Sequence, residues 1–183
     1  MNRREAWKLL NEYTKSESLI KHALCVEAAM RAYAEKWNED AEVYAVTGLL
    51  HDFDYEKWPD EHPQKGYEIL SDLGVPEDIR QAILGHAEYS GVLRESLLAK
   101  TLYAVDELSG FIIAVTLVKP DKSISSVTPK SVKKKMKDKR FAAKVSRETI
   151  RNGIQELGVD FEEHIGFVVE ALSKIAGEIG LNS

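Results

Sequence analysis

Apolar residues recur at helical spacing along most of the chain. One stripe steps by three and four residues through positions 19–33: Leu19, His22, Val26, Ala29 and Tyr33. This spacing predicts a helix that begins near Ser16 or Ser18 and turns the stripe toward the interior. Residues 41–51 are apolar almost all round, which is typical of a helix in the middle of a bundle. Few stretches alternate apolar and polar residues with the period of two that indicates a strand.

Prolines and glycines mark the ends of further helices. Residues 63–74 and 76–86 each begin with a proline, and the first of these stretches closes at a glycine. Residues 95–118 form one long apolar-rich stretch, with Gly110 as the position of a bend. Three more helices have N-terminal signals: Pro129, Ser146 and Asp160. We therefore expect an all-α bundle that forms a single domain over residues 1–183, with a basic helical extension from about residue 119.

The charge is distributed unevenly over an otherwise ordinary globular composition. Of the 183 residues, 44% are hydrophobic and 30% are charged, and the formal net charge is -5. Between Lys119 and Lys144, ten Lys or Arg residues stand against Asp121 and Asp138, which gives this segment a charge of +8 and leaves -13 for the rest. Such a basic segment attracts anions locally, or is simply a solvated helix face. A nucleic-acid polymer is not expected as a partner, because no recognition motif is present.

The cysteine count and the apolar runs indicate where the protein works. Cys25 is the only cysteine, which excludes an internal disulfide and a zinc site built on cysteines. The first ten residues are charged and lack the apolar core of a signal peptide. The longest apolar runs, 43–50 and 111–118, are far shorter than the ~20 residues of a membrane helix. We expect a cytoplasmic protein with no membrane partner, and association into an oligomer is compatible with the sequence.

Four polar residues occupy positions where the pattern predicts burial. His22 lies on the apolar stripe, His51 and Asp52 end the most buried helix, and Asp106 lies inside an apolar helix. A buried carboxylate without a cationic partner costs several kcal/mol, and one divalent ion would satisfy all four residues. The donor set contains no thiolate and suits Fe, Mn, Co, Ni, Mg or Zn. The alternative is that His22 is a hydrogen-bonded core residue and that Asp106 pairs with a lysine or an arginine.

These four residues, in the order H…HD…D, resemble the signature of the HD-domain metal-dependent phosphohydrolase superfamily. The phrases GLLHDFDYEKWPDEHP, AILGHAEYSGV and LYAVDELSGFI are similar to those of small stand-alone predicted HD hydrolases, and the likeness covers most of the chain. The resemblance implies an HD-type helical fold and hydrolysis of a phosphate ester or anhydride in a small molecule, with a nucleotide as the preferred class. Metal-activated water would be the nucleophile.

The resemblance also implies a set of site residues. One divalent ion would be held by four side chains: His22, His51, Asp52 and Asp106. Two-metal members of the superfamily carry additional histidines between the His-Asp doublet, here His51–Asp52, and the last aspartate. His62 and His86 fall in that interval. One or two ions per chain are therefore expected, and with two ions Asp52 is the natural bridge. The catalytic group is then made of four residues: His51, Asp52, His62 and His86.

If only one ion binds, His62 and His86 would instead contact the substrate phosphate or transfer protons to the leaving group. His86 is followed by Ala87 instead of a second histidine, which disfavours hydrolysis of cyclic di-GMP.

Residues around the doublet and in the basic segment supply candidates for supporting roles. Four acidic residues crowd the loop after the doublet: Asp54, Glu56, Asp60 and Glu61. A histidine ligand usually donates its other ring N–H to an acceptor, and we expect Asp54 or Glu56 to be that acceptor. The candidates for contacting the substrate phosphate are Lys119, Lys122 and Lys130.

Two other functions fit the same scaffold. One is a non-hydrolytic metal enzyme of the di-iron oxygenase type. The other is a module that binds a nucleotide through the basic segment without hydrolysing it.

Overall fold

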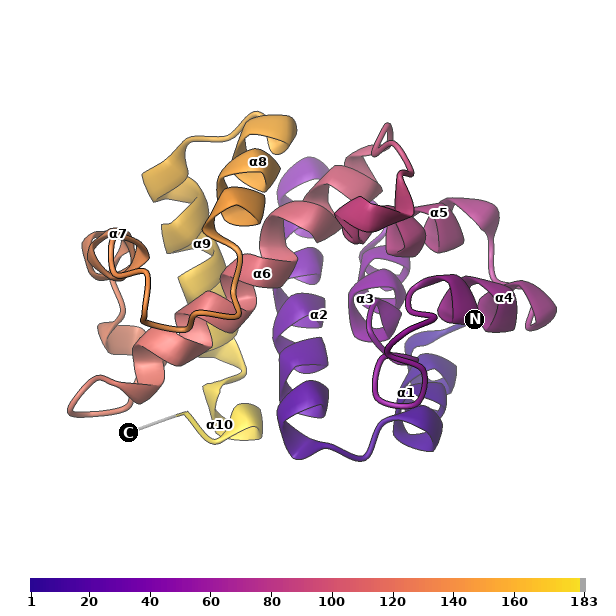
Figure 1. The fold of residues 1–183 in the computed structure, drawn as a ribbon, viewed down its shortest axis with the longest axis horizontal. Coiled ribbons are helices and arrows are strands. Elements are labelled where there is room, and N and C mark those ends of the chain that lie inside the picture. Colours follow the sequence, from indigo (N-terminus) through magenta and orange to yellow (C-terminus); the bar gives the residue numbers. More distant parts are fainter. Residues whose placement is uncertain (182–183) are drawn as a thin grey trace. The chain divides into compact units, whose positions relative to one another are not determined.

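The computed structural model describes residues 1–181, and within this range the secondary structure is helical with no strand (Figure 1). The all-α prediction is therefore confirmed. The α-helices are α1 (Arg3–Tyr13), α2 (Glu17–Trp37), α3 (Ala41–Leu50), α4 (Gln64–Asp72), α5 (Glu77–His86), α6 (Leu97–Leu117), α7 (Pro129–Met136), α8 (Arg147–Leu157), α9 (Phe161–Lys174) and α10 (Ala176–Ile179). Two short 3-10 turns, η1 (Glu88–Ser90) and η2 (Ile124–Ser126), lie between helices.

The helix boundaries follow the local signals in the sequence with few exceptions. Ser146 and Asp160 cap α8 and α9 through their side chains, and Pro129 opens α7. Gly110 lies inside α6 and does not interrupt it. The short helices at the two ends of the chain, α1 and α10, were not expected. The signal for α1 is a capping box, in which Asn2 and Glu5 each bond the other's backbone N–H.

The chain divides into two compact units, Met1–Tyr103 and Ala104 onward, and the boundary falls inside α6. In the first unit α3 packs against α1, α2 and α5 (Figure 1). Every residue of α3 from Tyr44 to Leu50 is buried, as its all-round apolar pattern indicates. The doublet therefore begins at the end of the best-packed helix of this unit.

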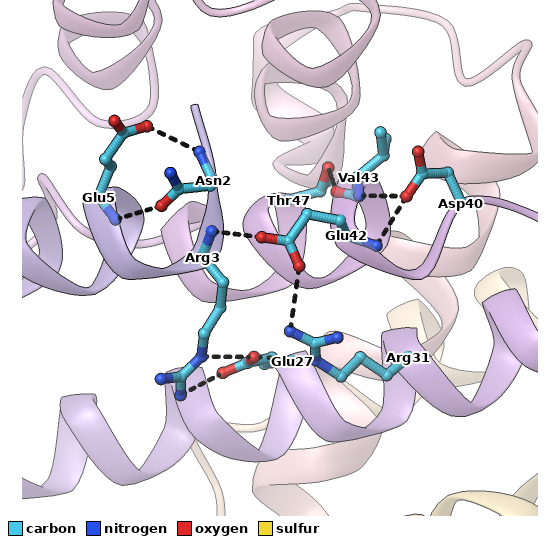
Figure 2. Close-up of polar contacts among 9 residues, drawn as sticks. All are labelled: Asn2, Arg3, Glu5, Glu27, Arg31, Asp40, Glu42, Val43 and Thr47. Carbon is cyan, nitrogen blue, oxygen red and sulfur yellow. Dashed lines mark hydrogen bonds and ion pairs between the residues drawn. The ribbon is translucent and has the colours of Figure 1, made fainter.

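A network of charged side chains fastens α1 and α2 together (Figure 2). Glu27 on α2 is buried, and both of its carboxylate oxygens accept hydrogen bonds from Arg3, at 2.9 and 3.0 Å. Arg31 donates to the same carboxylate at 3.0 Å. Glu42 at the start of α3 accepts the backbone N–H of Arg3 at 2.6 Å and lies 3.7 Å from the guanidinium of Arg31. Three helices are thus linked at one point.

Glu27→Ala should lower the free energy of unfolding by about 1–3 kcal/mol, because two arginines lose their buried partner while remaining partly hydrated. Glu42→Ala, which removes an exposed carboxylate of the same network, is the matched control and should cost under about 1 kcal/mol. Urea unfolding of the two variants measures both values. An equal loss of unfolding free energy in the two variants would show that the burial of Glu27 does not strengthen its ion pairs with the arginines.

In the second unit, α7 packs against α9, and its residues Val132 and Met136 are buried. The loop between α7 and α8 is held by Arg147, whose guanidinium donates to four backbone carbonyls: Asp138, Phe141, Ala142 and Val145. The lysine-rich α7 is therefore a fixed element of this unit.

Candidate metal centre

The carboxylate of Asp52 lies between two groups of histidines. Its Oδ2 is 3.4 Å from Nε2 of His51, and Nε2 of His51 is 3.2 Å from Nε2 of His22. Its Oδ1 is 3.2 Å from Nε2 of His62 and 3.2 Å from Nε2 of His86. Each group of three residues has ligand atoms within 4.8 Å of one another and could hold a metal ion. We call them cluster 1 (His22, His51, Asp52) and cluster 2 (Asp52, His62, His86).

Two of the histidines are oriented by the ends of their own helices. His51 follows the last residue of α3 and donates its Nδ1–H to the carbonyl of Gly48 at 2.8 Å. His86 ends α5 and donates its Nδ1–H to the carbonyl of Ile83. Carbonyls in the last turn of a helix lack a partner within the helix, so a histidine three residues later can take one. Both rings then face Asp52 with Nε2, which is the atom left for a metal ion when the ring is neutral and its proton is on Nδ1.

The close approach of α2 and α3 brings His22 beside His51. A Cβ on Gly48 would lie 3.0 Å from the backbone N and Cα of Glu27, so only glycine fits here without displacing one of the helices. Gly48 therefore has two roles: it allows α2 and α3 to approach closely, and its carbonyl accepts the hydrogen bond that orients His51.

His62 is oriented by Asp54, which is fully buried. Nδ1 of His62 is 2.7 Å from Oδ1 of Asp54, and Oδ2 of the same carboxylate accepts the backbone N–H of Gly66 at 2.7 Å. A Cβ on Gly66 would lie 2.9 Å from Cγ of Asp54, so the carboxylate fills the space that glycine leaves. The Asp54 carboxylate therefore holds Nδ1 of His62, while Nε2 on the other side of the ring faces the position of a metal ion. Metal-binding histidines are commonly supported in this way.

The charges in this site favour a bound cation. Burial raises the pKa of Asp52, but the charge of His51 and hydrogen bonds from His51, His62 and His86 outweigh it and hold this pKa well below its ordinary value. Burial lowers the pKa of His62, but its hydrogen bonds to Asp52 and Asp54 and their negative charges raise it to about 9. Without a metal ion, a protonated His62 supplies the positive charge that these carboxylates require.

A cavity of about 410 Å³ lies beside His62. Besides His62, its apolar and neutral lining comes from Pro63, Gln64, Leu84, Tyr89 and Ser90, and its charged lining is three carboxylates and one lysine: Asp60, Glu61, Glu68 and Lys65. Tyr89 is largely exposed and donates its hydroxyl hydrogen to the carbonyl of His62 at 2.9 Å. The cavity therefore adjoins cluster 2 and is acidic.

Five of the six predicted metal ligands come together in the two clusters. Asp106 is on α6 in the second unit, so its part in metal binding stays a prediction. The three lysines predicted to contact phosphate belong to the same unit: Lys119, Lys122 and Lys130. Their role also stays a prediction.

The choice between Asp54 and Glu56 as the histidine anchor is decided by their contacts. Glu56 accepts the backbone N–H groups of Lys15 and Ser16 at 2.8 and 2.9 Å, and so it holds the residues just before α2. Asp60 and Glu61 are exposed. The fifth histidine, His164, is buried in the second unit and hydrogen-bonds the carbonyl of Ala104, which is the role of an ordinary core histidine.

A comparison with protein-family models decides the family. The HD domain model matches residues 19–110, which is just over half of the chain. The chain belongs to the HD domain family. No solved structure gives a significant match.

The HD domain places the chain in a superfamily of metal-dependent hydrolases that bind divalent ions. The donor set of this HD domain fits such an ion. Three imidazoles present Nε2 to one carboxylate and have Nδ1 held by an acceptor, and the imidazole of His22 lies beside His51 in the same cluster. In the described part of the chain, no helix is both long and apolar enough to pass through a membrane.

Proposed function

We propose that this HD domain protein is a phosphohydrolase that releases phosphate from a small phosphorylated molecule, with a nucleotide as the preferred class. The observation that carries the proposal is the division of the Asp52 carboxylate, with Oδ2 toward cluster 1 and Oδ1 toward cluster 2. A carboxylate placed in this way is suited to bridge two divalent ions.

In this mechanism the protein side chains set the geometry. His22 and His51 would hold one ion, His62 and His86 the other, and Asp52 both. Divalent ions bound there would activate a water molecule near neutral pH and offset the charge of the phosphate. With an ion bound, Asp54 would keep the remaining proton of His62 on Nδ1, which leaves Nε2 as the ligand atom.

The acidic cavity beside His62 favours an uncharged leaving group over a polyphosphate. Its three carboxylates oppose one lysine, and that lysine is 3.3 Å from Glu68. A second or third phosphate would meet net negative charge there, whereas the sugar and base of a nucleoside would not. Its volume is within the range of small-molecule sites.

The test is a metal analysis of the purified protein followed by a phosphate-release screen. We expect up to two ions per chain, loss of activity with a chelator, and recovery with one of Mn, Fe, Co, Ni, Mg or Zn. Nucleoside monophosphates should be hydrolysed faster than the matching triphosphates. A protein that retains metal but releases no phosphate from any nucleotide would overturn the proposal.

The donor set also supports the second candidate, a non-hydrolytic di-iron enzyme. Four histidines and one bridging carboxylate suit iron as well as the other ions. Oxygen-dependent turnover by the iron-loaded protein, without phosphate release, would identify this function.

A further inference from the structure

The second unit contains a cavity that the metal centre does not use. It has a volume of about 410 Å³ and lies among α7, α8 and the start of α9. Its lining combines three cations, two carboxylates and two apolar side chains: Lys133, Lys137, Arg151, Asp160, Glu162, Met136 and Phe161. All of these residues belong to the second unit, so the cavity is described without reference to the metal centre.

The lysines of α7 that reach this cavity follow from helix geometry. Lys133 and Lys137 are four residues apart and lie on one face, about 6 Å apart along the axis. They directly follow Val132 and Met136, which are buried, so their face borders the surface on which α7 packs. Lys134 lies on α7 and Lys144 follows it in the chain, and both are exposed and absent from the lining.

Both carboxylates of the cavity already have partners. Asp160 accepts the backbone N–H groups of Glu162 and Glu163 at 2.8 and 3.0 Å, which is its role as the N-cap of α9. Glu162 is 3.1 Å from Nζ of Lys133. Asp160 therefore satisfies the N-terminal N–H groups of α9, and Glu162 neutralises the charge of Lys133.

Two cations remain without compensation. Within the described residues, the side chains of Lys137 and Arg151 have neither a hydrogen bond nor an ion pair. Like charges four residues apart on a helix repel, as Lys133 and Lys137 must, and a bound anion would relieve this repulsion. Phe161 adds an aromatic ring beside these charges, with Nζ of Lys133 5.9 Å from its centroid.

We infer that this cavity is a binding site for a phosphorylated ring compound of nucleotide size, separate from the proposed hydrolytic site. Lys137 and Arg151 bind the phosphate, Phe161 and Met136 contact the ring, and Glu162 accepts hydrogen bonds from hydroxyl or amino groups. The cavity is large enough for such a ligand. The inference stands whether or not the metal centre hydrolyses phosphate.

The test is calorimetric titration of the full chain with ADP in buffer containing EDTA, which suppresses binding through a metal ion. ADP should bind, and Lys137→Glu/Arg151→Glu should weaken binding at least about tenfold, since two charge-assisted contacts are lost. The matched control is Lys134→Glu/Lys144→Glu, which makes the same change in charge outside the cavity and should weaken binding less than about threefold. Asp52→Asn should leave ADP binding unchanged.

Three outcomes would overturn the inference. One is no heat of binding up to about 5 mM ADP. Another is equal weakening by the two double variants, which would show a general effect of charge. The last is equal affinity for ADP and inorganic pyrophosphate, which would show that the ring is not recognised. If the glutamate variant is misfolded by circular dichroism, Lys137→Ala/Arg151→Ala should replace it, with the same tenfold criterion.

Discussion

Asp52→Asn should remove both metal sites in one step. The amide has one oxygen in place of two, so it can no longer offer Oδ1 to cluster 2 and Oδ2 to cluster 1. It also loses the negative charge that draws in a cation. We expect metal content to fall below about a tenth of the native value and phosphate release to fall by about 10³-fold or more.

The fold should survive this substitution, because the amide has the shape of the carboxylate and its side chain is 24% exposed. Elemental analysis, a phosphate-release assay and circular dichroism measure the three effects. Asp72→Asn is the matched control, since it removes an exposed carboxylate at the end of α4, outside the cavity and both clusters, and should leave all three unchanged. Native turnover in Asp52→Asn would contradict the bridging role.

Asp54→Asn should weaken metal binding without touching the metal. The carboxylate accepts from both Nδ1 of His62 and the N–H of Gly66, so an amide that keeps its oxygen on Gly66 turns its NH₂ toward His62. The proton of His62 would then move to Nε2, the atom that should bind the ion. Loss of such an acceptor typically costs about 10–100-fold in metal affinity.

Competition with a chelator measures this loss, and NMR of the imidazole nitrogens reports the tautomer directly. Gly66→Ala displaces the same carboxylate from the opposite side, because the new methyl group would lie 2.9 Å from Cγ of Asp54. Gly166→Ala is its control in a helix with ordinary contact distances, the nearest being 3.7 Å. If Asp54→Asn keeps native affinity and the native tautomer, Asp54 does not position His62.

Helix content and the main histidines could be predicted from the sequence because both depend on local patterns. The apolar stripe placed His22, and the all-round apolar run placed His51 and Asp52 at the end of a buried helix. Prolines and capping residues located most boundaries, since their effects act within one turn. α1 was missed although its capping box and its apolar residues Ala6, Leu9 and Leu10 are present in the sequence.

Tertiary contacts could not be predicted in the same way. Asp54 and Glu56 look equivalent in the sequence. Asp54 contacts His62, whereas Glu56 binds the backbone just before α2, because the loop folds back on residues 15 and 16. The tight contacts of Gly48 and Gly66 are likewise with residues distant in the chain. Composition alone also gave no reason to select Lys133 and Lys137 from a run of lysines.

The histidine rings are oriented by two kinds of acceptor, backbone carbonyls and a side-chain carboxylate, which differ in how easily they are lost. His51 and His86 each donate a hydrogen bond to a backbone carbonyl of their own helix. Their orientation therefore persists for as long as α3 and α5 are intact. His62 relies on a carboxylate eight residues earlier in the chain and on a second loop position that braces it. If each cluster holds an ion, loosening of the 54–66 segment would release the ion of cluster 2 while cluster 1 keeps its donors, and metal content would drop in two stages as the protein is heated.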